Sequence, residues 1–174
     1  MYKKIYQLKH PNDIIYSIVM PVYNQENIIV ENIKSIIDHT VGYFEIIIIL
    51  DFCFDNTEKN IMEWVETYEN KSNHFIQILL FKNDEPLFET ACDNIGFKHS
   101  SGKYCLEIQS DMKMTEMGYN VQLTKPFTIL PNVIAVSGRC AHNLFNHEIG
   151  IGKLGSNVEK PISDLHVSKD KFYV

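Results

Sequence analysis

The chain has 174 residues, of which 45% are hydrophobic and 22% charged, and its formal net charge is −6. This length suits one domain with a substantial core, and the composition is that of an ordinary globular protein. The acidic balance and the scattered lysines exclude a nucleic-acid surface, which needs clustered basic residues. No apolar run reaches the roughly 20 residues of a membrane span. The N-terminus lacks an apolar signal-peptide core, so we expect a cytoplasmic protein.

The four cysteines, Cys53, Cys92, Cys105 and Cys140, lie far apart and form no C-x-x-C pair. Zinc-ribbon spacing is therefore absent. Because Cys105 falls within an expected strand, the simplest interpretation is a set of buried free thiols in a reducing compartment.

Strands and helices are expected to alternate along the chain after a polar lead-in at residues 1–14. The apolar runs predict strands at 17–20, 45–50, 75–81, 104–108 and 133–137. Between the strands, the sequence predicts four helices. The first follows residue 28, the second begins at the capping-box pattern Asp55–Glu58, the third ends at about His99, and the fourth runs from Thr115 to about Thr124. Pro126 should end or kink the last of these helices.

The helical period predicts which side chains face the core. These are Ile29, Ile33, Ile36 and Ile37 on the first helix, Ile61, Trp64, Val65 and Tyr68 on the second, and Phe88, Cys92 and Ile95 on the third. Short connections between alternating elements favour an α/β fold whose parallel strands are joined by right-handed crossovers.

Three of the expected strands end in polar residues. They are the stretches Tyr16 to Asn24, Glu45 to Asp51 and Tyr104 to Asp111. Ligands of open α/β sheets bind where the strands end, so one shared site is expected there.

Four segments together resemble a known family. They are Val19-Met20-Pro21-Val22-Tyr23-Asn24, Leu50-Asp51 through Asp55-Asn56-Thr57, Asn94-Ile95-Gly96 with Gly102-Lys103-Tyr104, and Gln109-Ser110-Asp111. Their order and spacing resemble family 2 glycosyltransferases over about residues 16–140. The resemblance implies a GT-A (Rossmann-like) α/β/α sandwich with a mainly parallel central sheet. It also implies a nucleotide-sugar-binding domain at 1–140 and a loop-rich extension at 141–174, the latter a shortened acceptor region.

The resemblance implies a metal-dependent inverting glycosyltransferase. Such an enzyme transfers a sugar from a nucleoside-diphosphate sugar, here a UDP-sugar, to an acceptor that the sequence does not identify (a glycan, a protein or a small molecule). Negative charge develops on the departing diphosphate, and a divalent cation, Mn²⁺ or Mg²⁺, stabilises it. Carboxylate oxygens are suitable ligands for either ion.

The matching positions assign roles to individual residues. Pro21, Val22 and Tyr23 are expected to line the nucleoside pocket, Asp51 to accept a hydrogen bond from the base, and Gln109 to bind the ribose. The metal ligands implied by the resemblance are Asp111 and, after the last strand, His142, with His147 as the other histidine of that region.

The sequence also departs from the family pattern. Leu50 and Gln109 stand where the family has Asp, and Asp93 stands where it often has Arg. No segment matches the family's general base, for which Glu148 and Asp164 are the candidates, with Glu159 also available. These departures leave open a catalytically impaired nucleotide-sugar-binding module, or a chain completed by a further domain or by homo-oligomerisation.

Each assigned residue also has a plainer explanation. Asp51 and Asp111 could cap turns or helices. The side-chain amide of Gln109 could form its hydrogen bonds with groups at the sheet edge, and Tyr23 could be an exposed turn residue. The G-x-G-x-x-G run from Gly150 to Gly155 is rejected as a dinucleotide site, because too little chain follows it for a βαβ unit. A nucleotidyltransferase is disfavoured, because Pro21-Val22-Tyr23-Asn24 lacks the Gly-rich, Arg-containing loop of those enzymes.

Overall fold

The structure is a computed structural model that describes residues 3–8, 13–69 and 74–138, the first of these as backbone only. The chain divides into two compact units, Met1–Asn120 and Val121–Val174. The first unit contains β1 (Lys3–Leu8), β2 (Tyr16–Val22), α1 (Ile29–His39), β3 (Phe44–Leu50), α2 (Thr57–Thr67), β4 (Phe75–Lys82), α3 (Phe88–His99) and β5 (Tyr104–Glu107). Helix α4 (Tyr119–Thr124) crosses the boundary between the units, and α5 (Pro126–Ile129) lies in the second.

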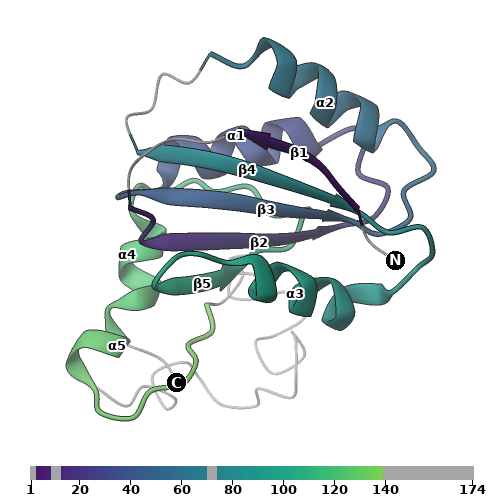
Figure 1. The fold of residues 1–174 in the computed structure, drawn as a ribbon. Helices are drawn as coiled ribbons and strands as arrows, with labels where there is room; N and C mark the ends of the chain where they lie inside the picture. Colours follow the sequence, from purple (N-terminus) through teal and green to yellow (C-terminus); the bar gives the residue numbers. More distant parts are fainter. Residues whose placement is uncertain (1–2, 9–12, 70–73, 139–174) are drawn as a thin grey trace, which may run out of the picture. The chain divides into compact units, whose positions relative to one another are not determined.

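The first unit is built on one five-stranded sheet with the order β1-β4-β3-β2-β5. Strands β4, β3, β2 and β5 are parallel, and β1 pairs antiparallel with β4 at the edge (Figure 1). The predicted α/β fold with a mainly parallel sheet is confirmed. The prediction of a polar lead-in at residues 1–14 is wrong, because the free edge of β4 supplies β1 with backbone partners that its own residues do not signal.

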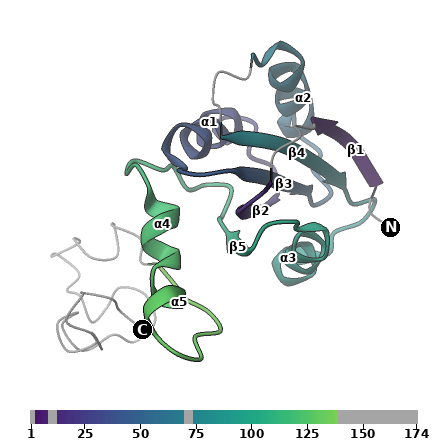
Figure 2. The ribbon, with the colours of Figure 1, turned by 60° about the vertical axis from the view of Figure 1, so that its left-hand side comes forward.

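Helices cover both faces of the sheet. Helices α1 and α2 lie on one face and α3 on the other, as the two ribbon views agree (Figures 1 and 2). All seven residues of β3 are buried, which explains why its sequence is a continuous apolar run rather than an alternating one. The four isoleucines predicted to face inward from α1 are all buried, as are Ile61, Trp64 and Val65 of α2.

Helix α3 packs closely on β2 and β3. Its core contacts involve the buried side chains of Val19, Ile47, Ile49, Leu79, Phe81 and Cys92. A Cβ atom added at Gly96 would lie only 2.2 Å from Cγ1 of Val19. Glycine is therefore required there so that the helix backbone can approach the sheet.

A buried carboxylate holds the amino edge of the sheet together. Glu45 is 0% exposed. It accepts hydrogen bonds from the Ser17 hydroxyl (2.5 Å), the Ser101 amide (2.7 Å) and the Gln77 side chain. The Gly102 amide donates to Ser17 Oγ, and a Cβ on Gly102 would meet the Ser17 nitrogen at 2.6 Å. The glycine therefore permits the close approach that completes this network.

Several local predictions are wrong. Phe88 is 77% exposed rather than inward, because its backbone has a left-handed φ of 63°. Cys105 is exposed because β5 is an edge strand, whereas Cys92 is buried and Cys53 half-buried, and all three are free thiols. Burial raises the pKa of the Cys92 thiol to about 12.

The chain after β5 is less regular than predicted. Helix α4 begins at Tyr119 rather than Thr115, and Pro126 starts the short helix α5. Residues 133–137 form no strand, and Ile134 is 94% exposed. A β-branched run becomes a strand only where a neighbouring strand pairs with it, and no described strand does so here. In the described part of the chain, no helix has the length and hydropathy needed to span a bilayer.

Candidate active site

The topology places a switch point at the carboxyl ends of β2 and β5. From β2 the chain proceeds outward through β3 and β4 with α1 and α2 on one face, then returns through α3 on the other face to β5. Ligands of open α/β sheets bind in the crevice at such a point. Tyr23 follows β2, Asp51 follows β3, and Gln109 follows β5, so the three lie at the same edge of adjacent strands.

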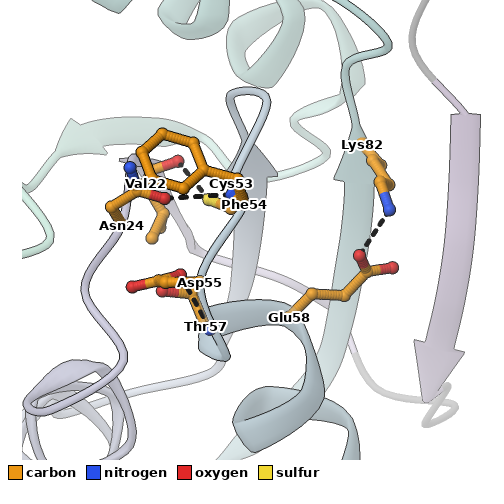
Figure 3. Close-up of polar contacts among 8 residues, drawn as sticks. All are labelled: Val22, Asn24, Cys53, Phe54, Asp55, Thr57, Glu58 and Lys82. Carbon is orange, nitrogen blue, oxygen red and sulfur yellow. Dashed lines mark hydrogen bonds and ion pairs between the residues drawn. The ribbon is translucent and has the colours of Figure 1, made fainter.

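The turns after β2 and β3 are joined by side-chain hydrogen bonds (Figure 3). The Phe54 amide donates to Asn24 Oδ1 (3.0 Å), and the Cys53 thiol donates to the Val22 carbonyl (3.3 Å). The Glu26 carboxylate accepts from both the amide and the side chain of Asn56. These contacts fix the two turns relative to one another.

Asp55 links the same two turns. Its carboxylate accepts from the Thr57 amide (2.9 Å) and the Glu26 amide (3.1 Å). Burial alone would raise the pKa of Asp55, but the hydrogen bonds from Thr57 and Glu26 lower it overall. The predicted capping box is not formed, because Asn56 occupies the N-cap position and Glu58 pairs with Lys82 at 2.5 Å.

The residues at the end of β2 differ in exposure. Pro21 and Val22 are buried within the sheet, whereas Tyr23 is 52% exposed and packs edge-on against Phe54 at 5.9 Å between ring centroids. The Val19 carbonyl accepts a hydrogen bond from the Ile108 amide, so the backbone polar groups of Val19 point toward β5. The backbone of Pro21, two residues further along β2, points to the same side, but β5 has already ended at that level. Its missing N–H therefore leaves no ladder hydrogen bond unmade.

Left-handed backbone conformations gather at this edge. Asn24 (φ 50°), Phe52 (φ 55°) and Phe88 (φ 63°) lie in or beside the turns that follow β2, β3 and β4. For bulky residues such as phenylalanine this conformation costs about 1–2 kcal/mol. Strain of this kind occurs preferentially at functional sites.

Asp51 anchors the start of α3. Its carboxylate accepts three hydrogen bonds of 2.8 Å, from the Asn83 side chain and from the Leu87 and Phe88 amides, and the residue is 7% exposed. The N-cap residue of α3, Leu87, has no side chain that could cap the helix. A carboxylate from a neighbouring strand therefore satisfies amides that the helix leaves free.

The loop after β5 is held by α1. The Asn32 side chain, buried in the first turn of α1, donates to the Ser110 carbonyl (2.9 Å). Asp111, the next residue, is exposed, and Lys113 beyond it pairs with Glu31. Gln109 Nε2 donates to Glu89 Oε1 (2.8 Å) and to Glu107 Oε1 (2.9 Å).

Three carboxylates gather between α3 and β5. The pKa of Glu107 is raised mainly by partial burial and to a smaller extent by the charges of Asp93 and Glu89. The hydrogen bond from Gln109 lowers this pKa and so opposes the shift. Burial and the charge of Glu89 likewise raise the pKa of Asp93, whose buried Oδ1 has no hydrogen-bond partner among the described residues. Asp93 therefore lies among like charges.

Several expected site residues lie outside the described residues, namely His142, His147, Glu148, Glu159 and Asp164. Among the residues that are described, no cluster of three or more His, Cys, Asp or Glu side chains could hold a metal ion. Sequence reasoning missed Asn83, although this residue directly follows a strand and could have been found as a strand-end polar group. It also missed Glu89, for which the sequence carries no signal.

The comparison with protein-family models matches residues 17–154 to "Glycosyl transferase family 2". The chain belongs to this family. The match extends over most of the chain and confirms the resemblance drawn from the strand-end motifs.

The family 2 chain is similar to parts of longer proteins. It is 33% identical over 99 residues to an uncharacterized glycosyltransferase of Rickettsia bellii, a match covering 57% of this chain and 13% of that protein. It is 27% identical over 100 residues to the Escherichia coli UDP-Glc:alpha-D-GlcNAc-diphosphoundecaprenol beta-1,3-glucosyltransferase WfgD, covering 58% of this chain and 36% of WfgD. The chain thus spans well under half the length of these relatives.

A solved crystal structure has the same fold. The crystal structure of S. aureus TarS matches with a TM-score of 0.52 at 19% identity, over 64% of this chain and 19% of TarS. Two glycines of the motifs that resemble family 2 have structural roles in this chain. Gly96 lets α3 touch the sheet, and Gly102 lets the loop before β5 reach Ser17.

Proposed function

We propose that the chain acts as an inverting glycosyltransferase that uses a UDP-sugar and a divalent metal ion. The observation that supports this proposal is that Asp51, Tyr23 and Gln109 follow the adjacent parallel strands β3, β2 and β5, respectively, at their carboxyl ends. Family membership and the UDP-Glc named for the relative WfgD support the donor class.

Each residue of the edge has a proposed role toward the donor. The exposed ring of Tyr23 would stack on the base, and Asp51, although engaged by α3, would accept the imide N–H on Oδ2, the oxygen that also accepts from the Phe88 amide. Gln109 would bind the ribose. The acceptor hydroxyl would attack the anomeric carbon, with Glu148 or Asp164 as the general base that takes its proton.

The metal would be held by Asp111 together with oxygens of the diphosphate, with His142 as a further ligand. Mg²⁺ sites of this kind use one or two carboxylates plus substrate phosphates, and the exposed carboxylate of Asp111 fits that donor set. When bound, the ion would stabilise the negative charge that develops on the departing diphosphate.

A binding module without catalysis is the second candidate. It is favoured by the absence of one family acid at Leu50, by Gln109 in place of Asp, and by the charge reversal at Asp93. Such a module would bind the nucleotide sugar and transfer nothing.

A thermal-shift screen tests both candidates. UDP, GDP, ADP, CDP and TDP are compared with and without Mn²⁺, and UDP with metal should raise the melting temperature most, by mass action on the folded state. Asp111→Asn should remove the metal-dependent part of this shift, whereas the matched control Glu116→Gln, an exposed acid five residues on, should keep it. An equal shift by every nucleotide, or by none, would contradict the proposal.

Release of UDP from a UDP-sugar by the wild type but not by Asp111→Asn would exclude the inactive module.

A further inference from the structure

We propose that Glu89 and Glu107 are positioning residues that hold the Gln109 amide with its carbonyl oxygen outward, as the acceptor for a ribose hydroxyl of the donor nucleotide. This inference rests on the proposed function, because it specifies how a donor would be recognised at Gln109.

The hydrogen bonds around Gln109 determine the orientation of its amide. Nε2 lies 2.8 Å from Glu89 Oε1 and 2.9 Å from Glu107 Oε1. An ionised carboxylate can only accept hydrogen bonds, so the NH₂ group must face the two glutamates and the carbonyl must point elsewhere. Both amide protons are then in use. Among the described residues, Gln109 Oε1 has no hydrogen-bond partner, so it remains available to a ligand.

The two glutamates come from elements that are themselves fixed. Glu107 is the last residue of β5, and Glu89 is the second residue of α3. The two residues before Glu89 donate their amides to the Asp51 carboxylate at 2.8 Å. Asp51 therefore sets the position of Glu89 through the first turn of α3, and Glu89 in turn orients Gln109.

The arrangement explains how a glutamine can stand where the family has an aspartate. A carboxylate at position 109 would add a fourth negative charge beside Glu89, Asp93 and Glu107, of which the last two already have raised pKa values. A free amide could present either its oxygen or its nitrogen to a ligand. The glutamates remove this ambiguity, so a neutral side chain presents only an acceptor, as an aspartate would.

Hydroxyl discrimination measures this role directly. The dissociation constants of UDP, 2′-deoxy-UDP and 3′-deoxy-UDP are determined by calorimetry in the presence of Mn²⁺. The wild type should bind one of the deoxy analogues about three- to ten-fold more weakly than UDP, the range expected for one neutral hydrogen bond. In Glu89→Ala/Glu107→Ala this ratio should fall to near one, because the amide can then rotate. Glu85→Ala, which removes an exposed charge from the loop before α3, should leave the ratio unchanged.

A second background separates positioning from a general structural effect. In Gln109→Asp the oxygen needs no orientation, and Glu89 and Glu107 only repel the new carboxylate. Removing both glutamates should therefore leave the ratio of UDP to deoxy-UDP affinities unchanged in this background, whereas in the wild-type background the ratio falls; the ratio is compared because loss of two negative charges favours any anionic nucleotide in both.

The outcomes distinguish the inference from the function on which it rests. If the wild type binds no UDP at all, the proposed function fails and the inference fails with it. If UDP binds but the wild type tolerates both deoxy analogues, or the double variant keeps the wild-type ratio, the inference is wrong and the proposed function stands. A fall of this ratio in both backgrounds would also overturn it.

Discussion

The two edges of the parallel sheet differ in backbone strain and in unpaired polar groups, although each also has a buried carboxylate, Glu45 or Asp51, that accepts three hydrogen bonds. At the amino edge, Glu45 is 0% exposed and accepts hydrogen bonds from Ser17, Gln77 and Ser101, and no residue with a left-handed backbone lies in this network. Near the carboxyl edge, Asp93 of α3 has a buried Oδ1 that finds no hydrogen-bond partner in the described part of the chain. Phe52 and Phe88 there combine left-handed backbones with exposed rings.

This difference is what we expect if the amino edge serves stability and the carboxyl edge serves the proposed binding of the donor. Buried polar groups of a purely structural network are satisfied within the protein, because each unsatisfied group costs free energy. Strained backbone and unpaired polar groups persist where a ligand or a reaction requires them. Four changes test whether the two edges differ in this way, ordered from the largest expected effect to the smallest.

Glu45→Ala should cause the largest loss. It removes the carboxylate acceptor of the buried Ser17 hydroxyl and Gln77 side chain and of the part-buried Ser101 amide. At about 1–3 kcal/mol for each buried donor, the free energy of unfolding should fall by on the order of 3 kcal/mol or more. Urea denaturation measures this. Glu63→Ala, which removes an exposed glutamate of α2, serves as the control and should change stability by less than about 0.5 kcal/mol. Similar effects from the two variants would show that the amino edge does not depend on this network.

Asp51→Ala should have an intermediate effect confined to α3. Loss of a capping acceptor costs about 0.5–2 kcal/mol, and the Leu87 and Phe88 amides should exchange faster with solvent. Hydrogen exchange read residue by residue checks this. The Asn60 amide in α2, which donates to the Asn56 carbonyl, should be unaffected. Uniformly faster exchange throughout the unit would contradict a local anchoring role.

Phe52→Gly should stabilise the protein. Glycine adopts a φ of 55° without the steric cost that phenylalanine has there. Glycine also makes the unfolded chain more flexible, which cancels part of this gain, so the free energy of unfolding should rise by about 0.5–1 kcal/mol. Thermal melting measures it. Destabilisation by this change would mean that contacts of the Phe52 ring outweigh the strain of its backbone.

Asp93→Asn should give the smallest effect, one that depends on pH. Because the pKa of Asp93 is raised in the folded state, ionisation of this group destabilises the fold as the pH rises above the ordinary value of 3.8. The variant should therefore melt slightly higher than the wild type at pH 7 and equally at pH 3. A difference that persists at pH 3 would indicate a packing effect rather than a charge effect.

The sequence by itself determined the repeating parts of the fold. Local patterns within single segments predict the long apolar run of β3, the inward isoleucines of α1 and the succession of strands β2 to β5 along the chain. The strand-end motifs also determined the family, because their order and spacing lie in the sequence itself. Gly96 and Gly102 could be recognised as motif residues, although not the contacts that require them.

Only the tertiary structure decided the partners of individual groups. The pairing of β1 with β4, the exposure of Cys105 and Phe88, the capture of Asp51 by the start of α3, and the two glutamates on Gln109 all join residues from different elements. Periodicity states which face of an element is apolar, because that depends on neighbours three or four residues away. It cannot state which amide a carboxylate meets, because that depends on where segments dozens of residues apart come together.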